Sequence, residues 1–286
     1  METSIQQTIK KNKNVILIGD KENAFLAKKY NIIHLFFDNY NHNDFSKYYI
    51  HDPSLDSNYM FELVCFQRRF VLLETMKALG IEQCLYLDSD ILYYGNIDEE
   101  FERISWYWKY KLAFPNSSGH TTYIFSTSAL KDFCNFIMSY YKDKKLFIEL
   151  ANWALSKKER RSDMSIFQLY IYKFPQNVFN LLHDYGDHII YDWSLNYDGW
   201  YKGFFWKKYF SIIHDKVYIY TKDNKRIETK TLHFHMHMKT FMRIIYNKNV
   251  MLYRFYLLLT LLFEQLYYKI PIIRKLRKKR KNKHLF

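Results

Sequence analysis

The sequence predicts a mixed α/β fold. Its first part contains an apolar run over 15–18, a helical segment over 22–30 and a second apolar run over 32–37. A strand, a helix and a strand joined by short links are typical of the beginning of a parallel sheet. A third apolar run, over 84–87, leads directly into a pair of aspartates. An uninterrupted run of this length indicates a buried strand, and here that strand would end at a charged site.

The composition narrows the class of protein. The 286 residues are enough for one α/β domain with a substantial core or for two small domains. Lys and Arg outnumber Asp and Glu by 43 to 29, a net charge of +14, with much of the excess near the C-terminus. Such an excess suits nucleic acid, an anionic membrane or an acidic substrate. The three cysteines, Cys65, Cys84 and Cys134, are too few and too scattered for a disulfide framework or a zinc site.

The other elements are predicted from the spacing of apolar residues and from the residues that end helices and strands. Residues 1–13 are polar and lysine-rich, so we expect a flexible leader, no signal peptide and a cytoplasmic location. Residues 38–58 are polar and predict a loop. The apolar spacing over 59–79, closed by Gly80, predicts a long helix. Further on, the pattern predicts helices over 99–108, 129–141 and 146–158 and a strand over 111–114.

The aspartates after the third apolar run form an Asp-x-Asp motif. In an extended chain, residues two apart point to the same side, so Asp88 and Asp90 could converge on one cation. Carboxylate oxygens suit Mg²⁺ or Mn²⁺, which in turn bind phosphate oxygens. The alternative is a turn in which the aspartates cap a helix that begins near Asp98.

The run Tyr-Leu-Asp-Ser-Asp-Ile-Leu-Tyr-Tyr-Gly-Asn-Ile-Asp-Glu-Glu-Phe, residues 86–101, closely resembles the metal-binding segment of nucleotide-sugar glycosyltransferases with the GT-A fold. It is most similar to the bacterial family 8 type, which transfers galactose or glucose onto lipooligosaccharide. The resemblance implies a GT-A mixed sheet flanked by helices over residues 14–248. It also implies metal-dependent transfer of a hexose, with retention of configuration, from a UDP-sugar to a hydroxyl of a surface glycan or glycolipid (lipopolysaccharide, lipooligosaccharide or capsule).

The resemblance further implies which residues bind the nucleotide sugar. The family carries an arginine near the donor diphosphate in the helix before the motif. Arg68 and Arg69 both lie there, and because neighbouring helical residues point in different directions, we favour Arg69 alone. Ser89 is expected beside the nucleotide sugar, and Asp20 beside the base, unless Asp20 only caps a helix.

Two later segments depart from the family pattern. His120 lies where the family has small residues and an Asn beside the donor sugar. Asp163 is the one retained residue of an Asp-Gln-Asp motif, and the resemblance makes it the catalytic candidate that orients the donor sugar or the acceptor hydroxyl. Its alternative role is to favour a helix start through the helix dipole. If the reaction inverts configuration, the general base could be Asp163, Asp184, Asp187 or Asp192.

Three alternating histidines form a second chemical landmark. On a strand, His233, His235 and His237 would lie on one side, as in a zinc site, or they could simply be half-buried strand residues. In the resembling family, a histidine completes the metal shell and a lysine six residues later contacts the donor phosphates. His233 and Lys239 have that spacing. Met236 replaces the family's glycine, which leaves His235 and His237 as alternative ligands.

The C-terminal segment, 249–286, predicts attachment to a membrane surface. Residues 250–268 are very apolar, but Arg254 and Glu264 leave too short an uncharged run to span a bilayer. A basic run over 274–283 follows, and an apolar helix beside a polybasic tail suits the anionic inner face of the cell membrane. The resembling enzymes carry such an extension. A helix packed on the domain and nucleic-acid binding are the alternatives, and the absence of a recognition motif leads us to expect no nucleic-acid partner.

Two other classes of protein compete with a transferase. A phosphatase of the haloacid dehalogenase type also has a hydrophobic strand leading to Asp-x-Asp, although Ile91 and Leu92 do not fit the way its motif continues. A non-catalytic membrane-associated protein with a GT-A shell is the other alternative. The departures over 119–122 and 163–165 keep it open.

Overall fold

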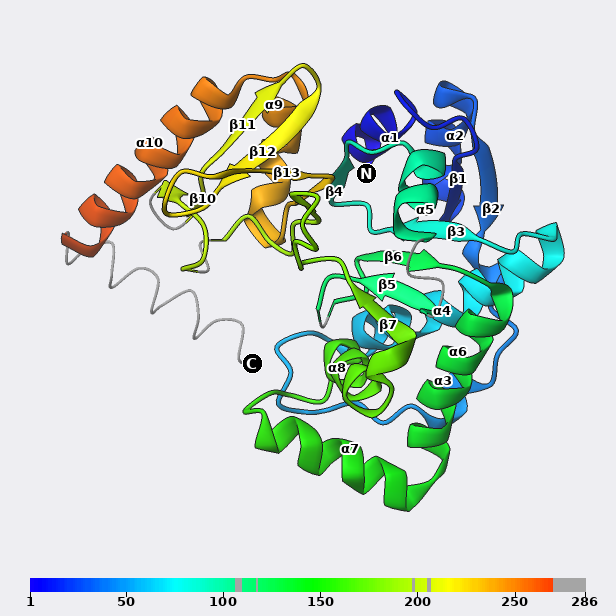
Figure 1. Ribbon diagram of the computed structural model, residues 1–286. Coiled ribbons are helices and arrows are strands. Elements are labelled where there is room, and N and C mark those ends of the chain that lie inside the picture. The colour runs from blue at the N-terminus through cyan, green and yellow to red at the C-terminus, as the bar shows by residue number, and fades with distance from the viewer. Residues whose placement is uncertain (106–109, 117, 197–198, 205–206, 270–286) are drawn as a thin grey trace. The chain divides into compact units, whose positions relative to one another are not determined.

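The computed structural model describes residues 1–105, 110–116, 118–196, 199–204 and 207–269. The chain divides into a larger unit, Met1–His235, and a smaller unit that begins at Met236. The larger unit combines helices with parallel and antiparallel strands (Figure 1), so the predicted mixed α/β class is confirmed.

The helices and strands have the following bounds. The helices are α1 Glu2–Thr8, α2 Ala24–Tyr30, α3 Phe45–Tyr48, α4 Tyr59–Leu79, α5 Ile97–Ser105, α6 Thr127–Lys142, α7 Lys144–Ser156, α8 Asp163–Lys173, α9 Met242–Tyr246 and α10 Val250–Lys269. Short 3-10 helices are η1 Lys21–Asn23, η2 Phe37–Tyr40, η3 Pro175–Asn177 and η4 Met236–Phe241. The strands are β1 Ile16–Gly19, β2 Ile33–Phe36, β3 Cys84–Leu87, β4 Ile91–Tyr93, β5 Leu112–Phe114, β6 Thr121–Ile124, β7 Val178–Asn180, β8 Ile189–Ile190, β9 Gly203–Phe204, β10 Lys207–Lys208, β11 Phe210–Ile213, β12 Lys216–Tyr220, β13 Arg226–Thr229 and β14 Thr231–His233.

The first strands and the long helix form as the sequence predicts. β1 and β2 pair in parallel, with α2 between them in the chain. Helix α4 begins where the Asn58 side chain accepts a hydrogen bond from the backbone N–H of Phe61 at 2.8 Å. It ends at Gly80, whose φ of 63° is the left-handed conformation that glycine adopts at little cost. The expected helix over 99–108 is α5, and residues 106–108 lie outside the described part of the chain.

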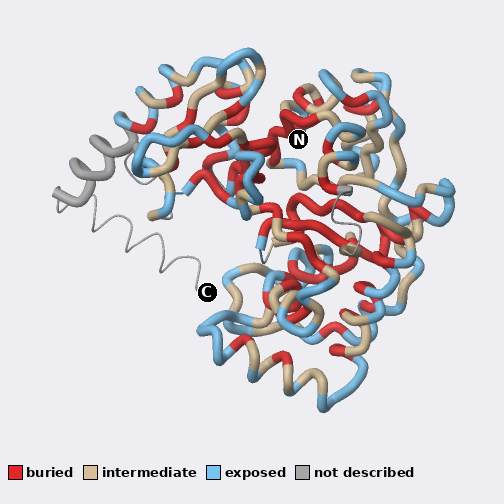
Figure 2. The backbone as a smooth tube through the Cα atoms, in the orientation of Figure 1, coloured by how far each residue is buried: buried red, intermediate tan, exposed pale blue. Residues whose placement is uncertain are grey.

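A four-stranded sheet in the order β3-β6-β5-β7 separates two apolar layers. The central strand β6 is antiparallel to both of its neighbours, β3 and β5, whereas β5 and β7 are parallel. Because side chains alternate along a strand, Leu112 and Phe114 face a core formed with α4, α6 and α8, while Ala113 faces a second cluster. The strands of this sheet are mostly buried in Figure 2.

The second cluster contains buried tyrosines whose hydroxyl groups are satisfied by one another. The Tyr93 and Tyr123 hydroxyls lie 3.0 Å apart, and those of Tyr123 and Tyr191 lie 2.8 Å apart. Tyr191 in turn donates to a carboxylate oxygen of the buried Glu100 at 2.5 Å. The chain of hydrogen bonds lets four polar groups be buried without leaving a hydroxyl unpaired.

Strand β4 leaves this sheet and pairs with β14 instead. The two strands are antiparallel, with His233 opposite Ile91. Helix α1 packs beside β4, and the Ser4 hydroxyl donates to the carbonyl oxygen of Ile91 at 2.6 Å. The expectation of a flexible leader over 1–13 is therefore wrong, because contacts with residues some eighty positions away order the segment.

The remaining strands form a sheet in the order β11-β12-β13-β8 and the short pair β9-β10. In the smaller unit, η4, α9 and α10 follow one another. The sequence pattern predicts a strand reaching His237, but β14 ends at His233 and the 3-10 turn η4 begins at Met236. The predicted apolar helix over 250–268 is α10. No helix in the described residues combines the length and apolarity needed to cross a bilayer.

Candidate functional site

The two motif aspartates lie in a tight turn between β3 and β4. The backbone N–H of Ile91 donates to the Asp88 carbonyl oxygen at 3.1 Å, so the extended conformation expected for this segment is wrong. The turn is held on both sides, because Asp88 N–H donates to the His120 carbonyl and Phe234 N–H donates to the Asp90 carbonyl. Those bonds continue the β3–β6 and β4–β14 ladders, so both sheets position the turn.

The Arg68 guanidinium joins carboxylates from two distant segments. Its Nη1 donates to both carboxylate oxygens of Asp88, at 2.8 and 2.9 Å, and its Nη2 donates to Asp163 at 2.9 Å. The Tyr86 hydroxyl also donates to Asp88, at 2.5 Å. Burial disfavours the charge on Arg68, but Tyr86, Asp88 and Asp163 outweigh it and raise the pKa of Arg68 above its usual value. The group is partly buried, with its charged atoms paired.

Arg69 lies in the core instead of at the aspartates. Its side chain is 2% exposed and its Nη2 donates to the Gly119 carbonyl oxygen at 2.7 Å. The guanidinium lies 4.2 Å from the centre of the Tyr86 ring and 5.2 Å from that of Phe167. Burial, followed by the neighbouring Arg68, lowers its pKa. We therefore correct the choice of arginine, since Arg68 is the one that faces the aspartates.

Asp163 is the first residue of α8, as the sequence predicts. Ser162 and Ser165 exchange hydrogen bonds at the start of this helix, at 3.0 and 2.7 Å. The carboxylate of Asp163 accepts a hydrogen bond from Arg68. The side chain is thus directed to the cluster with Asp88, which fits the functional interpretation better than a helix-start role alone.

His233 ends β14 beside Asp90. Its Nδ1 lies 2.5 Å from the carbonyl oxygen of Trp193, and because that oxygen can only accept, Nδ1 carries the proton. The other ring nitrogen, Nε2, then has a free lone pair and lies 3.8 Å from a carboxylate oxygen of Asp90. A histidine oriented in this way by a backbone carbonyl is prepared to bind a metal.

His120 is buried against His233. The two ring centres lie 4.1 Å apart with the planes tilted by 40°. Burial, with further contributions from His233, Arg68 and Arg69, lowers the pKa of His120 well below its usual value. His120 is therefore neutral at pH 7, and its contact with a donor sugar stays a prediction.

A buried ion pair supports His233 and was missed by the sequence reasoning. Asp192 and Lys208 are both almost fully buried, with Lys208 Nζ 3.0 Å from an Asp192 oxygen. The other Asp192 oxygen accepts from the backbone N–H of His233 at 3.1 Å. Because both its oxygens are engaged and inaccessible, Asp192 does not fit the general-base alternative. Its chain position, 41 residues before His233, carries no signal of this contact.

The other two acidic alternatives lie in a surface segment. Asp184 pairs with His188 at 2.8 Å, and Asp187 pairs with Arg103 at 2.6 Å. Neither is joined by a hydrogen bond to the Arg68 cluster among the described interactions.

The remaining predicted residues lie in different parts of the structure. Asp20 is exposed and caps η1 by accepting from the backbone N–H and side-chain amide of Asn23, at 3.1 and 2.6 Å, so its capping alternative is observed. Ser89 is exposed in the turn between the two aspartates. His235 follows the end of β14, with its ring 5.8 Å from that of His233. Lys239 belongs to η4 of the smaller unit, so its contact with a donor stays a prediction, and the side chain of His237 lies outside the described residues.

The donor set suits a hard divalent cation, although its members are not gathered. One arginine among three aspartates, Asp88, Asp90 and Asp163, leaves a formal excess of two negative charges. Carboxylate oxygens and an imidazole nitrogen are ligands that Mn²⁺ and Mg²⁺ accept. In the described part of the chain, no three His, Cys, Asp or Glu side chains converge as a metal site. Asp88 faces Arg68, so it would have to exchange that partner to join Asp90 and His233.

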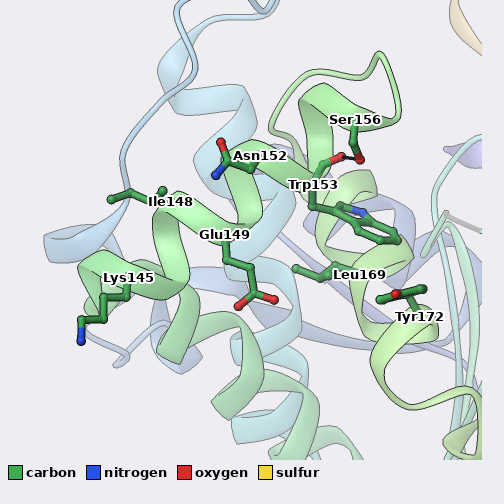
Figure 3. Close-up of a pocket in the computed structure, with 8 residues that line it drawn as sticks. All are labelled: Lys145, Ile148, Glu149, Asn152, Trp153, Ser156, Leu169 and Tyr172. Atoms are coloured by element: carbon green, nitrogen blue, oxygen red, sulfur yellow. Dashed lines mark hydrogen bonds between the residues drawn. The ribbon is translucent and has the colours of Figure 1, made fainter.

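A surface groove of about 470 Å³ lies elsewhere, between α7 and α8 (Figure 3). The Trp153 and Tyr172 rings meet in it, with their centres 4.5 Å apart. None of its lining residues belongs to the aspartate cluster, so the groove is separate from the candidate site.

No protein-family model matches the sequence, and a search of curated proteins found no match. Among solved structures, the fold resembles the apo crystal structure of mouse xyloside xylosyltransferase 1, with a TM-score of 0.47 and 11% sequence identity. The match covers 63% of this chain and 78% of that chain. A likeness at this level is too distant to assign an activity.

The packing around Arg69 predicts that Gly119→Ala is strongly destabilising. A Cβ at this position would lie 2.3 Å from Arg69 Nη2 and 2.3 Å from Phe167 Cζ, both held in the core. We expect the free energy of unfolding to fall by about 1–3 kcal/mol, as for other overpacked cores, in urea denaturation. Gly19→Ala is the control, because the three atoms nearest to its Cβ would all belong to the Asn23 side chain, at 3.2 Å or more. Equal losses in the two variants would contradict the tight packing of Arg69.

Proposed function

We propose that the protein is a metal-dependent glycosyltransferase that moves a hexose from a UDP-sugar to a hydroxyl of a cell-surface glycan or glycolipid. The observation that carries this proposal is the cluster formed by Arg68, Asp88 and Asp163 beside Asp90 and His233. The segment that resembles the metal-binding motif of such enzymes lies at this cluster, and its turn is held by two sheets. The resemblance and the geometry thus both favour Asp88, Asp90, Asp163 and His233, which supports the proposal.

The aspartate carboxylates and His233 Nε2 would hold Mn²⁺ or Mg²⁺. When bound, the cation supplies neutralising charge for the departing diphosphate. Trp193 fixes the ring of His233, and Asp192 fixes its backbone, so Nε2 keeps its direction toward Asp90. The site therefore holds one of its ligands in place before any cation arrives.

Arg68 can bind the donor with the same two nitrogens that now hold carboxylates. A guanidinium presents its donors in a planar fork that matches carboxylate and phosphate alike. A diphosphate or a sugar hydroxyl can therefore replace Asp88 or Asp163 as the acceptor from Arg68. Asp163, once released, is positioned to accept a hydrogen bond from a hydroxyl of the donor sugar or of the acceptor.

We also propose that α10 attaches the protein to an anionic membrane surface, at the inner face of the cell membrane. Met251, Phe255 and Leu258 are exposed and recur at helical spacing, whereas Tyr253 is buried against Phe241, with the ring centres 5.6 Å apart. An exposed apolar stripe on a helix suits the headgroup boundary of a bilayer. The basic run over 274–283, which lies outside the described residues, would add attraction to anionic lipids.

The first prediction concerns the nucleotide. UDP with Mn²⁺ should raise the melting temperature of the wild-type protein, since a ligand at 100 times its Kd stabilises the folded state by about 2.7 kcal/mol. Asp90→Ala should lose the shift, whereas the exposed Glu99→Ala should keep it. Differential scanning fluorimetry with UDP, GDP and CMP, each with and without Mn²⁺, measures this. If no nucleotide shifts the wild type, the transferase proposal fails and the non-catalytic alternative gains.

The second prediction concerns Arg68. In Arg68→Met, Asp88 loses its charged partner, so Mn²⁺ alone should bind about tenfold tighter, because the charge-assisted hydrogen bonds from Arg68 no longer compete for Asp88. UDP in the presence of Mn²⁺ should bind more weakly, because the guanidinium no longer meets the diphosphate. Titration calorimetry and the free Mn²⁺ signal in electron paramagnetic resonance measure both affinities.

The control for this experiment removes an arginine from another Arg–Asp pair. Arg160 pairs with Asp56 at 3.0 Å on the surface, and Arg160→Met should change neither affinity. Unchanged Mn²⁺ affinity in Arg68→Met would show that Arg68 does not compete for Asp88.

The third prediction concerns α10. Met251→Ser with Phe255→Ser should reduce sedimentation with vesicles that contain phosphatidylglycerol by about tenfold, because two apolar side chains no longer enter the boundary. Leu155→Ser, which changes an equally exposed apolar residue on α7, should leave the bound fraction unchanged. Equal binding of all three proteins would exclude α10 as the attachment site.

A further inference from the structure

An apolar stripe is exposed on α4. We define it as Met60, Phe61 and Val64, whose exposed fractions are 62%, 60% and 41%. Adjacent apolar side chains left this exposed commonly mark a binding surface. The opposite face of the same helix is buried in the core through Leu63, Phe66 and Phe70, so the stripe is not needed for packing.

The stripe leads to the candidate site. At 3.6 residues per turn, Phe61 lies two turns and Val64 one turn before Arg68 on the same helix face. Beyond Arg68, the following residues Val71 and Leu72 of that face are buried. The exposed apolar surface therefore ends at the guanidinium that holds Asp88 and Asp163.

The start of α8 brings apolar surface to the same cluster. Met164, the residue after Asp163, is exposed. The turn before α8 is fastened to the loop before α4, because the Arg161 N–H donates to a carboxylate oxygen of Asp52 at 3.0 Å and Arg161 Nη2 donates to the His51 carbonyl oxygen at 3.4 Å. The N-terminal ends of α4 and α8 are thus fixed beside each other, with polar groups at the cluster and apolar groups next to them.

We propose that the apolar stripe binds the hydrocarbon part of an amphiphilic acceptor, whose sugar headgroup lies at Arg68 and Asp163. The inference rests on the proposed function and selects a glycolipid over a water-soluble glycan. The apolar stripe is continuous with the polar cluster. A single molecule that contacts both must therefore be polar at one end and apolar at the other. A headgroup hydroxyl would accept from Arg68 or donate to Asp163, and the chain would cover Phe61 and Val64.

The test compares octyl β-D-glucoside with methyl β-D-glucoside, both below the micelle concentration of the octyl compound. Saturation-transfer NMR on the full chain should show at least about tenfold tighter binding of the octyl compound, since each buried methylene favours binding. Phe61→Ser with Val64→Ser should remove this advantage. Phe25→Ser is the matched control, because Phe25 on α2 is 63% exposed, and it should keep the advantage.

Any of the following outcomes would overturn the inference. They are an equal octyl advantage in the double variant, an equal loss in Phe25→Ser, and a wild-type dimer that the double variant converts to a monomer, which would assign the stripe to a second copy. Binding to phosphatidylglycerol vesicles through the stripe, without binding of the monomeric octyl compound, would assign it to a membrane surface and also overturn it. The assay needs no nucleotide, so a wild type that binds UDP and Mn²⁺ but shows no octyl advantage refutes this inference alone.

Discussion

The site depends on one positive charge that two negative charges share. Asp88 comes from the turn after β3 and Asp163 from the start of α8, and Arg68 on α4 is the group that both contact. Without a cation between them, two neighbouring carboxylates would repel each other and resist burial. The guanidinium therefore fixes the position of three chain segments at once, while leaving the cluster with more negative than positive charge. In the proposed function, a divalent cation gains Asp88 as a ligand only when another group takes the place of Asp88 at Arg68.

Helix α4 can present that charge because adjacent residues on a helix point in different directions. Arg69 is fixed in the core by Gly119, Tyr86 and Phe167, and this packing sets the rotation of α4. Arg68, the residue before it, therefore points away from the core and toward the aspartates. The interior arginine thus acts as the structural reference for the exterior one, and the small Gly119 makes room for it.

Local sequence pattern predicts the structure where neighbouring residues decide it. The bounds of α4, the first two strands, the start of α8 and the Asp-x-Asp motif all follow from apolar spacing, capping residues and a charged interruption. It fails where distant contacts decide. Choosing between adjacent arginines requires the rotation of a helix, which depends on its neighbours in space. The order of α1 comes from Ser4 and Ile91, and the role of Asp192 comes from Lys208 and His233, so neither has a local signal.

The boundary between the two compact units falls just after the site. His233 is the last residue of β14, and the smaller unit begins at Met236. A chain spans at most about 3.5 Å per residue, so Lys239, six residues on, stays within roughly 20 Å of His233 in any orientation of the smaller unit. The length of this link therefore limits how far Lys239 can lie from the imidazole that faces Asp90, whichever way the smaller unit is turned.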